Sequence, residues 1–310
     1  MSVGYENHRL FDQSREKIEM QEKISIRFFN DREVRAVWDS KDSRWLFSVL
    51  DIVSVLRDED DYQKTRNYWK YLKAKLKREG NELGSITTQM KLLAPDGKRH
   101  LSNVMSYDQI IALAKEFPSR NANRFIEWFT YSDETIDGKS KTKAYALWES
   151  SFMDSIQVGT VTGLQQIHGY LFGGLYDFAG QIRSKNIAKG GFQFAAARYL
   201  NQTLANIENM PENDYDQIMD KYIEMNVAHP FMEGNGRSAR IWLDMILKKR
   251  LGLCVDWSKV DKKNYLEAMT RSVVDGTAIK KLLKPALTDK IRDREIFMKG
   301  IDYSYYYEEE

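Results

Sequence analysis

The sequence contains a single cysteine, Cys254, so no intrachain disulfide can form. A chain without disulfides fits a reducing compartment, and we expect a cytoplasmic protein. No stretch approaches 18 consecutive apolar residues, which argues against a membrane-spanning helix. Residues 1–23 are charged and lack the apolar core of a signal peptide. These absences favour a protein that works inside the cell and makes no use of a membrane.

Helix-breaking residues are scarce as well. There are five prolines in 310 residues, and this composition favours helix over sheet. The hydrophobic content of 42% is enough for a packed core, and the length suggests two domains. The net charge of +2 is too close to neutral to identify a partner. We therefore expect a mostly α protein of two domains.

The first domain is predicted to be a small α+β unit over residues 24–131, after an N-terminal extension over 1–23. Apolar and polar residues alternate in ISIRFF and VRAVWDS, which makes residues 24–50 look rich in strand. A second hairpin is expected in KLLAPDGKRHLSNVM, where Asp96-Gly97 is a turn signal. Between these hairpins, RNYWKYLKAKLKREG has the pattern of a basic helix closed by Gly80.

Residues 132–144 are polar and charged, and we predict a linker there. The following residues, 145–310, show the apolar spacing of helices, for example at Leu164, Ile167 and Leu171. Their one expected hairpin lies in IRSKNIAKGGFQFA, with a glycine pair at its turn. The second domain is therefore predicted to be all-α apart from this small hairpin.

The densest group of polar residues, HPFMEGNGRSAR at positions 229–240, lies between two predicted helices. Gly234 and Gly236 let the backbone approach a ligand, and the next helix is expected to begin near Ser238. Loop amides followed by a helix N-terminus form a cradle for an anion. Arg237 and Arg240 are three residues apart and so share a helix face. Two guanidinium groups at such a cradle suit a polyphosphate.

Two further side chains supply chemistry. Glu233 offers a hard oxygen ligand that suits Mg²⁺ bridging phosphates, and His229 can accept a proton near pH 7. Together the group provides what a hydroxyl needs to attack a nucleotide phosphate. Taken singly, each feature also has a structural explanation. A histidine at a helix end often caps it, arginines on a helix face are often solvated, and Phe231 anchors the loop in the core on either interpretation.

HPFMEGNGRSAR resembles the complete motif of the Fic family, and no position departs from it. The resemblance extends upstream to GLYDFAGQIR and NIAKGGFQFA and covers roughly residues 145–310. It implies an all-α Fic fold with a β-hairpin flap. It also implies an enzyme that uses ATP and Mg²⁺ to transfer AMP to a Tyr, Ser or Thr hydroxyl of a target protein. Another nucleotidyl or phosphoryl transfer is the runner-up within the same class.

The resemblance implies a role for each motif side chain. His229 would deprotonate the target hydroxyl, and Glu233 would hold Mg²⁺. Asn235 and Arg237 would bind the α- and β-phosphates, and Arg240 would bind the γ-phosphate.

Other positions carry weaker implications. The phosphorylating branch of the family departs at the glycine-asparagine-glycine positions, so Gly234 and Gly236 favour AMP transfer. Asn226 lies one helical turn before the motif histidine and is a candidate for nucleotide contact. The upstream hairpin would be the flap that aligns the target segment by strand pairing. Its expected residues are Lys189, Gly190, Gly191 and Phe192.

The chain ends in SYYYEEE, where Ser304 and Glu308 share a face if this end is helical. A tyrosine-rich packing helix with an acidic end explains the spacing by itself. The placement also resembles the C-terminal inhibitory helix of one Fic class, although Glu309 departs from the Gly or Asn of its motif. A helix over about 290–310 would place Glu308 on Arg240, where the γ-phosphate binds, and would repress transfer.

Positive charge is concentrated in residues 64–99, which contain ten lysines or arginines and three acids. Tyr68, Trp69 and Tyr71 interleave with these charges. Such a segment can lie along phosphates, or it can be a solvated helix face with a buried aromatic side. Over residues 24–130 it resembles the N-terminal domain of the phage antirepressor Bro-N group, which implies DNA binding. The alternative function is therefore a DNA-binding regulator with a silent or sensory Fic domain.

The Fic resemblance also implies partners. Several bacterial Fic proteins act on topoisomerase subunits, so the ATPase subunit of DNA gyrase, gyrase B, is the expected target by analogy. A homo-oligomer is expected by the same analogy, because release of the inhibitory helix depends on assembly in relatives.

Overall fold

The computed structural model describes residues 24–42, 44–94, 98–117, 119–132, 134–189 and 191–309. The chain divides into two compact units, and the boundary lies between Phe129 and Thr130. The predicted extension over 1–23, the expected turn at Asp96-Gly97 and Gly190 of the expected flap lie outside the described residues. Within the described ranges, no helix is both long and apolar enough to cross a bilayer.

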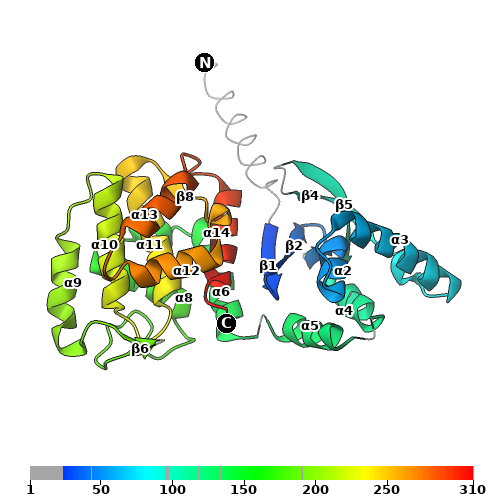
Figure 1. Ribbon diagram of the computed structural model, residues 1–310, viewed down its shortest axis with the longest axis horizontal. Coiled ribbons are helices and arrows are strands. Elements are labelled where there is room, and N and C mark those ends of the chain that lie inside the picture. Colours follow the sequence, from blue (N-terminus) through cyan, green and yellow to red (C-terminus); the bar gives the residue numbers. More distant parts are fainter. Residues whose placement is uncertain are drawn as a thin grey trace, which may run out of the picture. The chain divides into compact units, whose positions relative to one another are not determined.

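The first unit is built on a five-stranded antiparallel sheet with strand order β1-β2-β3-β5-β4 (Figure 1). Alternate side chains point to opposite faces, so Val34 and Phe47 pack on the helices while Val37 and Leu46 form a second cluster. The β4–β5 ladder confirms the expected second hairpin. The strands are β1 Ile24–Phe29, β2 Arg32–Asp39, β3 Arg44–Ser48, β4 Thr88–Leu93 and β5 Arg99–Ser106.

Helices cover one face of this sheet. Ile52, Leu72 and Phe125 come from three different helices and share one buried cluster with Val34 and Phe47 of the sheet. This cluster is the main hydrophobic core of the first unit. The helices are α2 Val49–Arg57, α3 Tyr62–Arg78, α4 Tyr107–Lys115 and α5 Arg120–Tyr131, with a 3₁₀ turn, η1, at Glu82–Gly84.

The strand-rich prediction for residues 24–50 was wrong at its end. Ser48 accepts a hydrogen bond from the Asp51 amide at 3.3 Å and so caps α2. Ile52 and Leu56 then lie one turn apart on the buried face of this helix. A short apolar run fits a buried strand and a buried helix equally well, so periodicity could not separate them.

The second unit is a helical bundle in which α11 packs against both α8 and α10 (Figure 1). The last helix, α14, packs against α6 and α11. The expected mostly α architecture with an α+β N-terminal part is confirmed. The helices are α6 Ile136–Glu149, α7 Phe152–Ser155, α8 Val161–Phe172, α9 Leu200–Glu208, α10 Tyr215–Ala228, α11 Asn235–Leu251, α12 Lys262–Arg271, α13 Thr277–Leu283 and α14 Arg294–Tyr306, with 3₁₀ turns η2 Ala197–Tyr199, η3 Trp257–Lys259 and η4 Lys284–Ala286.

Two short ladders complete this unit. The expected hairpin is present as β6 (Ala188–Lys189) paired with β7 (Phe192–Gln193). A second ladder pairs β8 (Cys254–Val255) with β9 (Leu287–Thr288), and the sequence did not predict it. Strands of two residues are too short to show an alternating pattern, so this omission follows from their length.

The linker predicted over 132–144 was mostly wrong. Thr135 accepts a hydrogen bond from an amide three residues further on (3.0 Å), and α6 begins at Ile136. Ser140 and Ala144 are fully buried, because α6 packs against α8 and α14. The helix buries only one narrow stripe, so its overall composition is as polar as that of a linker.

Candidate active site

The motif occupies the loop between α10 and α11. His229 ends α10 with φ 48°, in the left-handed region, and its amide donates to the Met225 carbonyl at 3.1 Å. Phe231 is fully buried and anchors the loop in the core, as expected. The helix is therefore capped by the backbone of His229, and its imidazole is available for other contacts.

Gly234 is required at its position for two reasons. Its φ of 79° favours glycine, and a Cβ there would lie 2.4 Å from the Phe172 ring. It is also the cap of α11, which begins at Asn235 instead of near Ser238 as predicted. The first turn of α11 therefore contains Arg237, and its amides face the end of the loop without intrahelical partners.

Asn235 does not have the expected geometry for a phosphate ligand. Its Oδ1 accepts a hydrogen bond from the Phe231 amide and its Nδ2 donates to the Phe231 carbonyl, both at 2.8 Å. The side chain is buried and ties the loop to the start of α11. Only the backbone amide of Asn235 therefore remains available to bind an anion.

The His229 imidazole is oriented on two sides. Its Nδ1 lies 3.0 Å from the Asn226 carbonyl, which can only accept, so Nδ1 carries the proton in the neutral ring. The ring stacks on Phe194 with centroids 3.7 Å apart. Burial lowers the pKa of His229 below its usual value. The ring is therefore neutral near pH 7 and has Nε2 available to accept a proton. Asn226 orients the ring through its backbone carbonyl, and contact of its side chain with a nucleotide stays a prediction.

Arg240 is almost fully buried against the C-terminal segment. Its Nε donates to Ser304 Oγ and its Nη2 donates to the Ser304 carbonyl, each at 2.7 Å. Nη2 also donates to Glu308 Oε1 at 2.5 Å. Burial acts to raise the pKa of Glu308, but Arg240 outweighs burial and holds this pKa below its usual value. Ser304 and Glu308 thus converge on one guanidinium.

Glu308 also contacts the start of α11. A Cβ added at Gly236 would lie 2.2 Å from Glu308 Oε1, so only glycine leaves room for this carboxylate. Negative charge is favourable near a helix N-terminus, where the backbone amides point outward. The anion cradle expected from the sequence therefore faces a carboxylate of the same chain.

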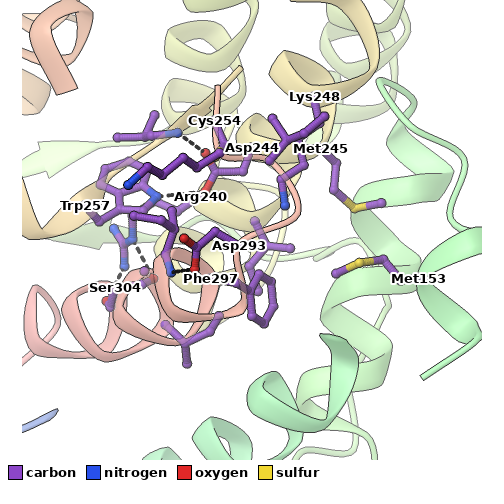
Figure 2. A pocket seen from close by; sticks show the side chains of 17 residues that line it. Met153, Arg240, Asp244, Met245, Lys248, Cys254, Trp257, Asp293, Phe297 and Ser304 are labelled. Carbon is purple, nitrogen blue, oxygen red and sulfur yellow. Dashed lines mark hydrogen bonds between the residues drawn. The ribbon is translucent and has the colours of Figure 1, made fainter. Parts of the chain in front are cut away.

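A narrow pocket lies along the contact of α11 with α14, and Arg240 and Ser304 form part of its lining (Figure 2). Asp244 lines it too and accepts hydrogen bonds from the Val255 amide and Trp257 Nε1, both at 2.8 Å. The accessible space is about 20 Å³, enough for about one water. Because α14 lies close on α11, the space between them is too small for a nucleotide.

Arg237 is held by two acids. It forms an ion pair with Asp137 of α6, and its Nη2 donates to Glu233 Oε1 at 3.0 Å. Its Nε is buried and has no hydrogen-bond partner among the described residues. Asp137 was missed in the sequence because it lies in the predicted linker. A buried guanidinium with one unused donor suits an oxyanion ligand.

Glu233 is the candidate metal ligand. Its side chain is 56% exposed, and Oε1 accepts hydrogen bonds from the Gly234 amide and Arg237, each at 3.0 Å. The described ranges contain no group of three or more His, Cys, Asp or Glu side chains placed to hold a metal ion. One exposed carboxylate fits Mg²⁺, which is commonly held by one or two carboxylates together with substrate phosphates.

The expected flap is the β6–β7 hairpin. Lys189 is exposed, Gly191 adopts φ 81° at the turn, and Phe192 packs edge-on against Phe194. Each of the two strands has one edge without a partner strand in the described part of the chain. Such an edge can accept a strand from another protein. Because Phe194 follows β7 directly and stacks on His229, this hairpin lies beside the imidazole.

Two residues that support the loop were not singled out from the sequence. His168 is fully buried, accepts from the Gly180 amide at 2.8 Å and donates from Nε2 to the Glu233 carbonyl at 2.9 Å. Arg183 donates from Nε to the His229 carbonyl at 2.7 Å. Gly180 and Arg183 lie in the upstream stretch GLYDFAGQIR, but spacing alone does not show that this stretch reaches the loop.

The motif loop and the residues that support it lie in a segment that matches the model of a known family. Residues 159–247 match the Fic/DOC family model. This Fic/DOC-like segment includes α8, the β6–β7 hairpin, α10 and the whole motif loop.

Named relatives of the Fic/DOC-like segment are adenylyltransferases. Protein adenylyltransferase VbhT of Bartonella schoenbuchensis is 30% identical over 147 residues, which are 43% of this chain and 30% of VbhT. Probable protein adenylyltransferase y4lH of Sinorhizobium fredii is 31% identical over 118 residues, 34% of this chain and 61% of y4lH. The chain thus spans less than two thirds of the length of either relative. These similarities support a Fic-type transferase.

One solved structure aligns with part of the chain. The crystal structure of the BepC protein from Bartonella tribocorum with bound AMPPNP aligns with a TM-score of 0.44 and 18% identity. The alignment covers 50% of this chain and 85% of that one.

Proposed function

We propose that this protein transfers AMP from ATP to a hydroxyl of a target protein, and that its own C-terminal helix represses the transfer. The observation that carries the proposal is the placement of Glu308. Its carboxylate lies against Gly236 at the start of α11 and pairs with buried Arg240. A carboxylate bound in this way marks an anion site. His229 belongs to the same loop between α10 and α11, so this loop also supplies a proton acceptor.

The reaction follows from these groups. His229 Nε2 removes the proton from the target hydroxyl, because Nδ1 is already engaged with Asn226. The hydroxyl oxygen forms a bond to the α-phosphorus of ATP, and the bond between this phosphorus and the bridging oxygen to the β-phosphate breaks. Pyrophosphate leaves, and the AMP moiety stays on the target. The displacement requires the attacking hydroxyl oxygen, the α-phosphorus and the leaving bridging oxygen to lie in line.

The phosphates would be bound by α11. Its first-turn amides would bind the α-phosphate, and Arg237 has a buried Nε without a hydrogen-bond partner in the described part of the chain to offer to a phosphate oxygen. Mg²⁺ held by Glu233 would neutralise part of the phosphate charge. Arg240 would bind the γ-phosphate once Glu308 has left it.

Repression would come from two carboxylates. Glu308 engages Arg240 and Asp137 engages Arg237, so each motif arginine already has an anionic partner. A triphosphate must displace Glu308 before its γ-phosphate can reach Arg240. ATP that binds beside Glu308 would have its α-phosphate out of line with the attacking hydroxyl.

The target is proposed to bind by strand pairing. β6 and β7 each have an open edge beside His229, so an extended segment added there would bring a Tyr, Ser or Thr hydroxyl toward Nε2. The ATPase subunit of DNA gyrase is the first candidate target, as the sequence resemblance implies.

The test is transfer of label from ATP labelled at the α-phosphate to purified gyrase ATPase subunit and to proteins of a lysate. Glu308→Gly is expected to increase transfer roughly 10- to 100-fold, because it removes the competing carboxylate. Glu309→Ala is the control, since it removes a carboxylate one residue later on an exposed side chain without introducing the Gly of the inhibitory motif. His229→Ala in the Glu308→Gly protein is expected to abolish transfer.

Three outcomes would contradict the proposal. Equal transfer by the wild type and Glu308→Gly would reject repression by this tail. Transfer that persists without His229 would reject its role as base. Label that reaches the product from the γ-phosphate but not from the α-phosphate would indicate phosphorylation.

A second proposed function, DNA binding, belongs to the first unit. On α3, Arg66, Lys70, Lys77 and Arg78 are exposed, and none has an ion-pair partner in the described part of the chain. Tyr71 on the same helix is 56% exposed. A basic helix face with an exposed aromatic ring suits the phosphates of DNA.

Fluorescence anisotropy with a labelled DNA duplex over a range of salt concentrations tests this second function. The double variant Lys70→Glu and Lys77→Glu is expected to weaken binding, and each lost phosphate contact lowers the salt slope by about 0.9. Lys249→Glu with Lys263→Glu, two exposed sites of the second unit, is the charge-matched control. Equal binding by the two double variants would contradict a site on α3.

A further inference from the structure

Arg183 joins two parts of the site that are separate in the sequence. It lies in the loop after α8, and its side chain is buried. On one side, Nε donates to the His229 carbonyl at 2.7 Å and Nη2 donates to the Ala228 carbonyl at 3.0 Å. On the other side, Nη1 donates to the Lys185 carbonyl at 2.7 Å and Nη2 to the Ala195 carbonyl at 2.6 Å. One guanidinium thus makes four hydrogen bonds.

The four acceptors belong to two functional parts. Ala228 and His229 form the end of α10, which carries the imidazole. Lys185 and Ala195 lie on the two sides of the β6–β7 hairpin, one before it and one after it. The planar guanidinium has donors in fixed directions, so it sets the distance between the hairpin base and the end of α10.

This link controls what surrounds the imidazole. Ala195 directly follows Phe194, whose ring stacks on His229 at 3.7 Å. The Ala195 amide donates to the Val227 carbonyl at 3.3 Å, a long bond that supports the same junction weakly. Without the Arg183 side chain, four carbonyls would lose their donor, one of them in a buried hydrogen bond. In the described part of the chain, the hairpin base would then be tied to the end of α10 only by the backbone bonds of Arg183 to Pro230 (2.9 Å) and of Ala195 to Val227.

We propose that Arg183 is a positioning residue: it holds the hairpin that receives the target segment at a set distance from the His229 imidazole. This inference rests on the proposed transfer of AMP, to which it adds a residue that contacts neither nucleotide nor target. Its effect is on the chemical step, because the attacking hydroxyl and the base must be within hydrogen-bond reach at the same time.

A simple capping role for Arg183 makes a different prediction. A cation at a helix C-terminus satisfies the last carbonyls and stabilises the helix. Capping requires only the bonds to Ala228 and His229, whereas the bonds to Lys185 and Ala195 extend to the hairpin. Loss of a cap lowers stability without a specific effect on the rate of transfer by the folded protein.

The test uses Arg183→Gln and Arg183→Lys in the full chain with Glu308→Gly, and Arg271→Gln as the charge-matched control at an exposed site of α12. ATP affinity is measured by calorimetry and transfer by single-turnover kinetics with saturating ATP. For Arg183→Gln we expect an ATP dissociation constant within about 3-fold of the parent and a rate lower by roughly 100-fold. Arg183→Lys keeps the charge and part of the bonding, so it is expected to restore part of the rate and to fold where the glutamine variant fails.

A second readout does not depend on transfer. The sequence has four histidines, so ring-proton NMR signals can be assigned with His229→Gln. The Phe194 ring shifts the signals of the stacked imidazole. In Arg183→Lys and Arg183→Gln these shifts are expected to shrink toward the values of a free histidine, and in Arg271→Gln they are expected to stay. Unchanged His229 signals in folded Arg183 variants would overturn the proposal.

The two readouts separate this inference from the proposed function. If Glu308→Gly transfers no AMP to any target, the proposed function fails, and the NMR shifts still decide whether Arg183 holds the hairpin on the imidazole. If transfer occurs and the Arg183 variants lose rate and ATP affinity together, positioning of the hairpin is rejected in favour of a nucleotide-binding role. A rate equal to that of Arg271→Gln would also overturn the inference.

Discussion

Two histidines of the second unit support the same loop in opposite tautomers. His229 has its proton on Nδ1, because it faces the Asn226 carbonyl. His168 has its proton on Nε2, because Nδ1 accepts from the Gly180 amide while Nε2 donates to the Glu233 carbonyl. His229 therefore has the lone pair of Nε2 available, whereas both ring nitrogens of His168 form hydrogen bonds with the backbone. Residue type alone does not distinguish these roles.

His168 leads to a prediction about stability. Burial lowers its pKa from 6.5 to about 4. Because the unfolded chain binds the proton more tightly, the stability from neutral His168 is complete above pH 6.5 and is lost as the pH falls toward 4. Between pH 7 and pH 5 we expect a loss of about 2 kcal/mol from this group. Urea unfolding of the wild type and His168→Gln at both pH values measures it, since glutamine can keep both hydrogen bonds without titrating. Equal pH dependence in the two proteins would contradict the assignment.

At the scale of secondary-structure elements, α6 and α14 approach the arginines of α11 from different parts of the sequence. α14 and its C-terminal end are anchored by Tyr307, whose hydroxyl contacts the Trp257 and Val260 carbonyls at 3.0 and 2.7 Å. α6 contributes Asp137 to Arg237. These arginines are thus contacted by α6, which precedes α11 in the sequence, and by α14, which follows it.

The contribution of α6 can be measured by Asp137→Asn. The Asp137 side chain is 56% exposed, so water weakens its ion pair with Arg237. We expect ATP affinity to increase about 2- to 5-fold, because Arg237 becomes available to a phosphate. Asp154→Asn on α7, an exposed acid away from the arginines, is the control. Calorimetric titration with ATP is the measurement, and an unchanged or lower affinity would show that Asp137 does not compete with the nucleotide.

Features of the candidate site that lie within one short stretch of sequence could be predicted from that stretch. The glycines, the fully buried Phe231 and the spacing of Ser304 and Glu308 all lie within single stretches, and their geometry matches the expectation. The six-residue strands and the long helices were also predictable, because apolar periodicity extends over several repeats. The shortest strands, β8 and β9, have no such repeat.

The remaining features depend on contacts between distant segments. Asp137 reaches Arg237 across 100 positions, and Arg183 reaches His229 across 46. The Fic resemblance implied that Asn235 binds a phosphate, but the loop uses both polar atoms of its side chain on Phe231. The type of a side chain shows what it can bind, and only its surroundings show what it does bind.

At the scale of the whole molecule, the chain combines an α+β unit with a helical unit, and each has its own core. The connection is short: α5 ends at Tyr131 and α6 begins at Ile136. Asp137 is the second residue of α6. The start of α6 therefore belongs to the helical unit, where Asp137 pairs with an arginine of the candidate active site.

The single cysteine makes release of the tail measurable in the natural protein. Cys254 is 3% exposed and lines the pocket between α11 and α14 (Figure 2), and burial raises its pKa to about 12. Since alkylation requires an accessible thiolate, we expect slow labelling in the wild type. Glu308→Gly or added ATP is expected to accelerate labelling, and Glu309→Ala is expected to leave it unchanged. Mass spectrometry of timed reactions with iodoacetamide gives the rates, and equal rates in all proteins would show that the tail stays docked.

The chain thus contains a single natural site for labelling by thiol reagents. Because the sequence has no other cysteine, the rate of modification by iodoacetamide reports on the exposure of Cys254 alone. The natural cysteine therefore takes the place of a dye or an engineered probe.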